Sequence, residues 1–164
     1  MKFPAISVES DFAKLVVSII ACQLAGAAGA FFSAPAIPAW YAQLAKPDFT
    51  PPNWVFAPAW TFLYLLMGIS LYLIWKRIER PGAGRALELF ALQLVLNVIW
   101  SAAFFGLQSP VAGLAAIIVL ALAIVATIAE FWKLDEWAAV LLLPYLGWVS
   151  FAAALNYGIW MLNA

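Results

Sequence analysis

Residues 111–132 read VAGLAAIIVLALAIVATIAEFW, a run of 22 amino acids with one charged side chain, Glu130, near its end. As an α-helix, a run of this length spans about 33 Å, which is enough to cross the hydrocarbon core of a bilayer. Lipid offers no hydrogen-bond partners, so a spanning segment must pair its own backbone groups, as a helix does. This stretch therefore predicts a transmembrane helix.

Four other apolar runs predict further transmembrane helices. Charged residues make up only 10% of the 164 residues, whereas a soluble domain carries about 25% because its surface must be solvated. We therefore predict an all-α membrane protein, a single domain (residues 1–164) built as a bundle of five transmembrane helices. The expected spans are about 15–33, 54–75, 86–106, 111–132 and 137–162, with a long structured loop at about 34–53.

Lysine and arginine residues are distributed unequally between the two sides of this bundle. Seven of the eight lie in the N-terminal tail, the second loop and the fourth loop, which share one side, and Lys46 is alone on the other. Cytoplasmic loops carry an excess of basic residues. We expect a bacterial inner membrane, with the N-terminus in the cytoplasm and the C-terminus outside. The seven residues are Lys2, Lys14, Lys76, Arg77, Arg80, Arg85 and Lys133.

The loop at about 34–53 is too apolar for a solvated linker. It contains Trp40, Tyr41 and Phe49 together with five prolines. Prolines fix φ and lower the entropy cost of ordering a chain, and long loops in compact proteins are usually functional, often as lids. We predict a structured lid over one mouth of the bundle.

Several residue types that carry chemistry are missing. The chain has no histidine and one cysteine, Cys22, which argues against a metal site and excludes an intramolecular disulfide. Glu88 and Glu130 lie near span ends, and Glu130 is expected to pair with Lys133 one turn away. Coupled transporters usually place an ionisable group inside the membrane. The middle of each span contains no such group, which counts against a coupled transporter. The net charge of zero gives no reason to expect a nucleic-acid partner.

Neutral polar residues recur at helical spacing inside the spans. Gln93, Asn97 and Ser101 share one face of the third span, and Trp148 and Asn156 share one face of the fifth. Hydrogen bonding between helices alone would account for such groups. A second interpretation is a buried cavity, because the deeper of these groups lie about 9–14 Å below the loop-bearing side.

Three tryptophans lie deeper than this residue type usually does. Tryptophan is enriched at the two membrane interfaces, but Trp60, Trp100 and Trp148 fall well inside the spans. They either fill space between helices or line a cavity whose flat walls stack on a flat aromatic ligand.

Small residues recur every four positions in the first and third spans. Such rows allow close helix packing, either within one chain or between the chains of a homodimer, and the sequence does not separate the two outcomes. The rows are Ala21, Ala25 and Gly29; Cys22, Gly26 and Ala30; and Ala102 with Gly106.

Three stretches resemble one known family. They are residues 40–68, WYAQLAKPDFTPPNWVFAPAWTFLYLLMG; residues 93–106, QLVLNVIWSAAFFG; and residues 144–148, PYLGW, followed by Leu155-Asn156. In this order they are similar to the tryptophan-rich sensory proteins of bacteria, also called translocator proteins or peripheral benzodiazepine receptors. The resemblance extends over essentially the whole chain.

The resemblance implies a receptor or sensor that binds porphyrins such as protoporphyrin, and isoquinoline-type ligands, in a pocket below the first loop. It implies no metal and no cofactor other than the porphyrin as ligand. The partners expected are a porphyrin or other hydrophobic small molecule, the lipid bilayer and, through the small-residue faces, a second copy of the chain. The implied ligand-binding residues are Ala25, Gly26, Trp40, Trp60, Gln93, Asn97, Trp100, Tyr145, Trp148 and Asn156.

Other functions stay open at this point. The family also implies light-dependent porphyrin breakdown, in which Trp60 and Trp148 would act as catalytic residues. Tetrapyrrole transport and a scaffold with an incidental pocket are further alternatives. One feature departs from the animal members: no basic residue follows Tyr157, so the cholesterol-recognition pattern, a weak motif even when complete, is not expected to function here.

Overall fold

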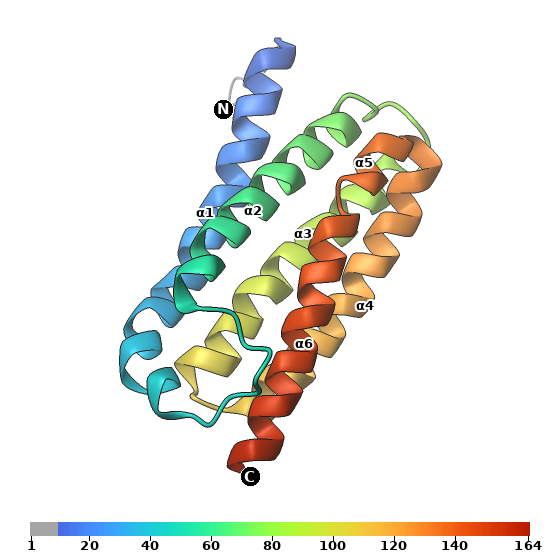
Figure 1. Cartoon of the computed structure of the whole chain (residues 1–164). Helices are drawn as coiled ribbons and strands as arrows, with labels where there is room; N and C mark the ends of the chain where they lie inside the picture. Colours follow the sequence, from blue (N-terminus) through green and yellow to red (C-terminus); the bar gives the residue numbers. More distant parts are fainter. Residues whose placement is uncertain (1–9) are drawn as a thin grey trace, which may run out of the picture.

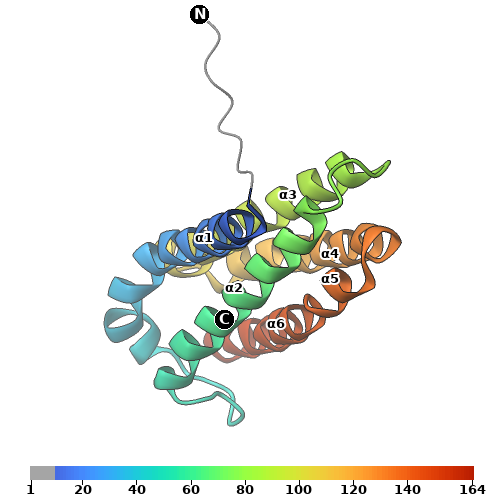
Figure 2. The same ribbon diagram turned by 90° about the horizontal axis from the view of Figure 1, so that it is seen from above.

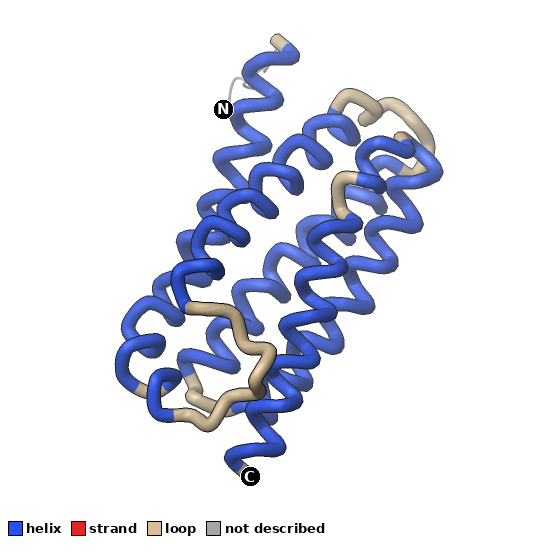
Figure 3. The backbone as a smooth tube through the Cα atoms, in the orientation of Figure 1, coloured by secondary structure: helices blue, strands red, loops and turns tan. Residues whose placement is uncertain are grey.

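The computed structural model describes residues 10–164 and shows the all-helical fold that the sequence predicts (Figures 1 and 3). Five helical segments of this part of the chain are long and apolar enough to cross a membrane. Lys2, used above to predict the topology, lies outside the described residues. The elements are α1 (Asp11–Ala39), η1 (Tyr41–Gln43), α2 (Asn53–Trp75), α3 (Ala83–Ser101), η2 (Ala102–Gly106), α4 (Pro110–Leu134), α5 (Glu136–Val140) and α6 (Leu143–Asn163).

The helix starts follow local capping chemistry. Ser10 accepts a hydrogen bond from the Ala13 N–H at the start of α1, and Ser109 accepts one from Ala112 at the start of α4. Both are favourable N-cap residues. Asp135 accepts from two backbone N–H groups of α5. The predicted bounds of the second and fourth spans are confirmed within two residues.

The prediction that α1 ends before Pro35 is wrong. The helix continues through Pro35 and Pro38 to Ala39, and the Trp40 N–H bonds to the Ala36 carbonyl at its end. Each proline removes one backbone donor, but Ala36 is buried and Ile37 lines the cavity described below. Packing therefore maintains the helix, and the lid loop is shorter than predicted, residues 40–52.

The third and fifth spans also differ from the prediction. The third begins at Ala83, after Gly82 in a left-handed conformation, and its last turn is the π-helix η2, in which the Leu107 N–H bonds to the Ala102 carbonyl. The fifth is interrupted after Val140, so that α5 and α6 replace one continuous helix. Pro144 in the first turn of α6 has no N–H for the Val140 carbonyl, which gives a physical reason for the break.

The helices form a closed ring around the core. α1 packs against α2 and α3, α3 against α4, and α4 against both α5 and α6. α2 closes the ring mainly through α5 and touches α6 only slightly. Figure 2 shows the arrangement of the helices from above. Since α2 and α6 are in little contact, space remains between them near the lid loop.

Most charged residues lie near the helix ends that are remote from the lid loop. α1 begins and α2 ends at this end of the bundle (Figure 1). The predicted Glu130–Lys133 pair is confirmed at 2.9 Å. Lys76 pairs with Asp11 at 3.0 Å, and this hydrogen bond raises the pKa of the Lys76 ammonium above its ordinary value. Exposed pairs of this kind contribute little to stability, so they mark the aqueous end of the bundle more than they hold it together.

The small residues of α1 serve packing within the chain. A Cβ on Gly26 would lie 2.6 Å from the Tyr64 ring, and one on Gly29 would lie 3.1 Å from Ser101 Oγ. For these two glycines, the contacts favour helix packing within one chain over packing between the chains of a homodimer. A homodimer stays a prediction, which light scattering of the detergent-solubilised protein would test.

Candidate ligand-binding cavity

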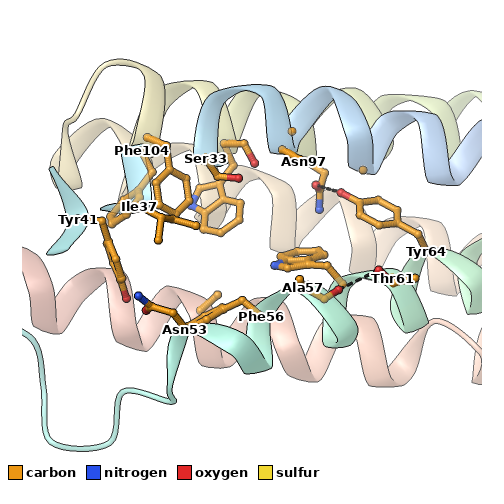
Figure 4. Close-up of a pocket in the computed structure, with 18 of the residues that line it drawn as sticks. Ser33, Ile37, Tyr41, Asn53, Phe56, Ala57, Thr61, Tyr64, Asn97 and Phe104 are labelled. Carbon is orange, nitrogen blue, oxygen red and sulfur yellow. Dashed lines mark hydrogen bonds between the residues drawn. The ribbon is translucent and has the colours of Figure 1, made fainter. Parts of the chain in front are cut away.

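The bundle contains a cavity of about 430 Å³ beneath the lid loop. Ligand sites typically measure about 300–1,000 Å³ and combine apolar walls with a few polar groups. Figure 4 shows the walls: Tyr64 and Asn97 lie at one end, and Tyr41 and Phe104 at the other. Side chains from α1, α2, α3, η2 and α6 contribute, together with Tyr41 of η1.

A hydrogen-bonded triad forms the inner end of the cavity. Tyr64 Oη donates to Asn97 Oδ1 at 2.6 Å, and Asn97 Nδ2 donates to Tyr145 Oη at 2.9 Å (Figure 4). All three side chains are at least 95% buried, where hydrogen bonds are strong and unpaired groups costly. The triad therefore fixes α2, α3 and α6 relative to one another. Asn97 retains one amide hydrogen and one lone pair that it could offer to a ligand.

Aromatic rings make up much of the remaining wall. The Trp60 ring stacks on Tyr64 with centroids 5.6 Å apart, and its centroid lies 5.9 Å from that of Trp100. Trp100 in turn stacks with Phe104 at 6.3 Å. Aromatic rings prefer offset-stacked or edge-to-face partners at such distances, so these walls are suited to a flat aromatic ligand.

The lid loop covers the outer end of the cavity. Tyr41 is only 4% exposed and lies against Phe104 and Phe105, with ring centroids 6.3 and 5.9 Å away. Burial raises the pKa of the Tyr41 hydroxyl, so this side chain is neutral. The Lys46 ammonium lies 4.7 Å from the Tyr41 ring centroid, a cation–π distance, and donates to the Leu44 carbonyl.

Contacts with α6 hold the lid loop in place. The Asn163 side chain accepts from the Ala45 N–H at 3.0 Å and donates to the Ala45 carbonyl at 2.9 Å. A Cβ on Gly158 would lie 2.5 Å from Pro47, so the absence of a side chain lets the loop approach α6 closely. The C-terminal turn of α6 thus anchors the loop over the cavity.

Two buried indole N–H groups lack a hydrogen-bond acceptor among residues 10–164. These are Trp100 Nε1, on the cavity wall, and Trp148 Nε1. A buried donor without a partner costs about 1–3 kcal/mol, and native proteins rarely leave such groups unpaired without a reason. A ligand that carries an acceptor would satisfy the Trp100 donor.

Five of the ten residues expected to bind a ligand line the cavity, and five do not. Gly26, Trp60, Asn97, Trp100 and Asn156 are part of its wall. The other five are not lining residues: Trp40 packs on Phe104 at 5.4 Å, Tyr145 accepts a hydrogen bond from Asn97, and Trp148 packs edge-on against Phe56, with ring centroids 6.0 Å apart. Ala25 is packed against the core, and Gln93 is buried beside Met67. Ligand binding by any of these ten residues stays a prediction.

Most wall residues, including most of those on α1 and at the start of α2, were not predicted to bind a ligand. Gln23 was the available signal, because it is a polar residue in the middle of an otherwise apolar span, and its Nε2 donates to the Thr61 carbonyl at 3.0 Å. Small and apolar residues give no such signal. The wall residues outside the expected ten are Gln23, Ala27, Gly29, Ala30, Ser33, Ile37, Tyr41, Asn53, Phe56, Ala57, Thr61, Tyr64, Ser101, Phe104, Phe105, Ala152, Leu155 and Ile159.

The wall of the cavity is made of apolar, aromatic and neutral polar side chains. No cluster of three or more potential metal-ligating side chains occurs in the part of the chain that the structure describes, and the residues of the wall include no carboxylate, lysine or arginine. Together, the five spans and the largely apolar cavity define an integral membrane protein with a cavity inside its helical bundle.

Comparison with known proteins identifies the family. The TspO/MBR family matches residues 18–161. The chain is 51% identical over 151 residues to the tryptophan-rich protein TspO of Archaeoglobus fulgidus, which covers 92% of this chain and 97% of that protein. It is 37% identical to the tryptophan-rich sensory protein of Cereibacter sphaeroides, over 93% of each chain. It is 39% identical to the human translocator protein, over 76% of this chain and 75% of that protein. The chain therefore belongs to the TspO/MBR family, which confirms the resemblance seen in the sequence.

Proposed function

We propose that this protein is a membrane receptor or sensor that binds a porphyrin-like tetrapyrrole, or another flat hydrophobic molecule, in the cavity beneath the lid loop. The observation that carries the proposal is the stacked wall of Trp60, Tyr64, Trp100 and Phe104 around a cavity of about 430 Å³. Such a wall matches the faces of a flat conjugated ring. The names of the relatives, a tryptophan-rich sensory protein among them, agree with a sensing role.

The polar groups support a ligand with hydrogen-bond acceptors. Trp100 Nε1 has no acceptor within the described residues, and Asn97 has one amide hydrogen beyond those it uses. A tetrapyrrole presents ring nitrogens and carboxyl oxygens that would pair with these donors. The wall has no cationic side chain, so affinity is expected to come mainly from stacking and burial of apolar surface.

A photochemical enzyme is the second candidate. Trp60 lies on the cavity wall in a cluster with Tyr64 and Trp100, so that a photo-excited ligand stacked there would meet an electron donor. Trp148 packs against Phe56 and is not a lining residue, which favours Trp60 over Trp148 for such a role. Saturable binding in the dark without product supports the receptor; ligand breakdown that requires light and fails in Trp60→Phe supports the enzyme.

Quenching of tryptophan fluorescence by protoporphyrin IX in the dark tests the binding proposal. We expect saturable quenching that weakens about tenfold in Trp60→Phe and Trp100→Phe, equivalent to about 1.4 kcal/mol of binding free energy. Trp148→Phe should weaken binding less, because Trp148 does not line the cavity. Trp137→Phe is the matched control, because Trp137 is 72% exposed at the far end of the bundle. Quenching that never saturates, or that responds equally in all four variants, would contradict the proposal.

We also propose that the charged end of the bundle faces the cytoplasm of a bacterial cell and that the lid loop faces outward. Six of the basic residues counted above lie within or next to the helix ends on the charged side, and Lys46 lies on the loop side. A membrane-impermeant maleimide added to whole cells should label Asp48→Cys and leave Glu79→Cys unlabelled, since Cys22 is fully buried. The reverse pattern would invert the assigned topology.

A further inference from the structure

We propose that ligands enter the cavity sideways, from the hydrocarbon core of the membrane, through a mouth between α1 and α2. The lateral mouth is defined by Ala27 and Ala30 of α1 and by Ala57 and Thr61 of α2. This inference rests on the proposed ligand binding and adds the route and the source of the ligand: a hydrophobic molecule already dissolved in the bilayer.

The exposure of the wall residues locates the mouth. All four residues of the lateral mouth are exposed although they line the cavity. By contrast, every wall residue contributed by α6 is buried, and those contributed by α3 and η2 are buried or, for Phe105, half-buried. Four of the long helices line the cavity, and of these only α1 and α2 supply exposed side chains to its wall. The opening therefore lies on the side of the bundle formed by α1 and α2.

The depth of the mouth places it in the hydrocarbon. Ala27 lies near the middle of the 29-residue helix α1, and Thr61 is eight residues, about 12 Å of helix, below the start of α2 at Asn53. The neighbouring outward-facing side chains Leu24, Phe31 and Phe62 are each more than half exposed. An apolar surface of this kind at this depth contacts lipid tails.

The end of the bundle that carries the lid loop offers a poorer route. The lid loop is held by the paired hydrogen bonds of Asn163 with Ala45 and by the contact of Pro47 with Gly158. Tyr41 fills the space beneath it and is 4% exposed. A ligand entering from water would have to break these contacts, and a hydrophobic molecule is also scarce in water compared with the membrane.

The size of the mouth depends on short side chains. Its inner corner is closed by the hydrogen bond from Gln23 Nε2 to the Thr61 carbonyl at 3.0 Å, and beside this bond Gly26 lies directly against Tyr64. Above the corner, alanines on both helices leave the gap open. A phenylalanine in place of Ala27 or Ala57 would narrow the gap, and it would do so at an exposed position where the core need not repack.

The test is the rate of binding in reconstituted vesicles. Protoporphyrin IX is delivered from donor vesicles, and tryptophan quenching is followed in time for Ala27→Phe, Ala57→Phe and the control Ala28→Phe, an exposed neighbour on α1 that does not line the cavity. We expect association and dissociation to slow about tenfold in the two mouth variants, or about 1.4 kcal/mol of activation free energy, and to be unchanged in the control. Equal rates in all three would overturn the proposal.

Asn163→Ala separates the two routes, because it frees the lid loop without touching the mouth. Lateral entry predicts unchanged association in this variant, with the observed rate following the ligand content of the membrane. Faster association in Asn163→Ala, together with an unchanged association rate in Ala27→Phe, would assign entry to the lid loop and overturn the proposal. Failure of the unmodified protein to bind at equilibrium would instead refute the proposed function, and the route with it, so the two failures are distinguishable.

Discussion

Replacing Asn97 by leucine should weaken ligand binding at least tenfold and also lower the stability of the bundle. Asn97 is the only described link between the Tyr64 and Tyr145 hydroxyls, and leucine would leave both buried without that partner. An unpaired buried polar group costs about 1–3 kcal/mol, although single interhelical hydrogen bonds in membranes have averaged less. Equilibrium quenching by protoporphyrin IX and the thermal midpoint of aggregation in detergent measure the two effects.

Gln93→Met is the matched control one turn away on the same helix. Gln93 is equally buried, but its Oε1 has no partner within residues 10–164 and its Nε2 contacts only Met67 Sδ at 4.0 Å. We expect its removal to leave stability unchanged or slightly higher and binding unchanged. Adding Tyr64→Phe to Asn97→Leu should recover part of the lost stability, because it removes one of the stranded hydroxyls. Equal behaviour of Asn97→Leu and Gln93→Met would contradict the role assigned to the triad.

Replacing Gly68 by alanine should produce the largest loss of stability of any single methyl group added to the bundle. The new Cβ would lie 2.6 Å from the Cα of Ile19 and 3.0 Å from its backbone nitrogen. Because the obstruction is backbone and cannot rotate away, α1 must move from α2. Overpacking typically costs about 1–3 kcal/mol, and the larger Gly68→Val should cost more. The thermal midpoint in detergent measures both.

Gly147→Ala provides the control for this experiment. A Cβ at Gly147 meets no heavy atom within 4 Å, and alanine favours a helix over glycine by up to about 1 kcal/mol. We expect the same chemical change to be neutral or stabilising at position 147 and strongly destabilising at position 68. If both variants melted alike, close contact between α1 and α2 would not be what limits the fold.

The number and position of the spans could be predicted because lipid imposes them locally. Each span must be apolar along about 20 residues and must pair its own backbone groups, and both demands are visible in a short window of sequence. The ends were less predictable. Pro35 and Pro38 indicated a helix end, yet α1 continues to Ala39, since the packing of Ala36 and Ile37 outweighs the missing donors.

The candidate site was predictable where its residues carry an unusual chemical signal. Asn97, Trp60 and Trp100 stood out as polar or aromatic groups at depth, and the structure places all three on the cavity wall. Trp148 carried the same signal but packs against Phe56 and does not line the cavity, because residue type does not specify which way a side chain points around its helix. Ala27 and Ala57 carried no signal, although they define the opening.

The sequence by itself determined that this chain has five spans apolar enough to cross a membrane and belongs to the TspO/MBR family. These properties follow from composition, local hydrophobicity and motif order. The tertiary structure alone decided that α2 departs from α6 and leaves a cavity, that Asn163 holds the lid loop, and that the cavity opens between α1 and α2. The cavity, the fixed lid loop and the opening depend on contacts between residues as far apart as Ala45 and Asn163. No local sequence pattern encodes such contacts.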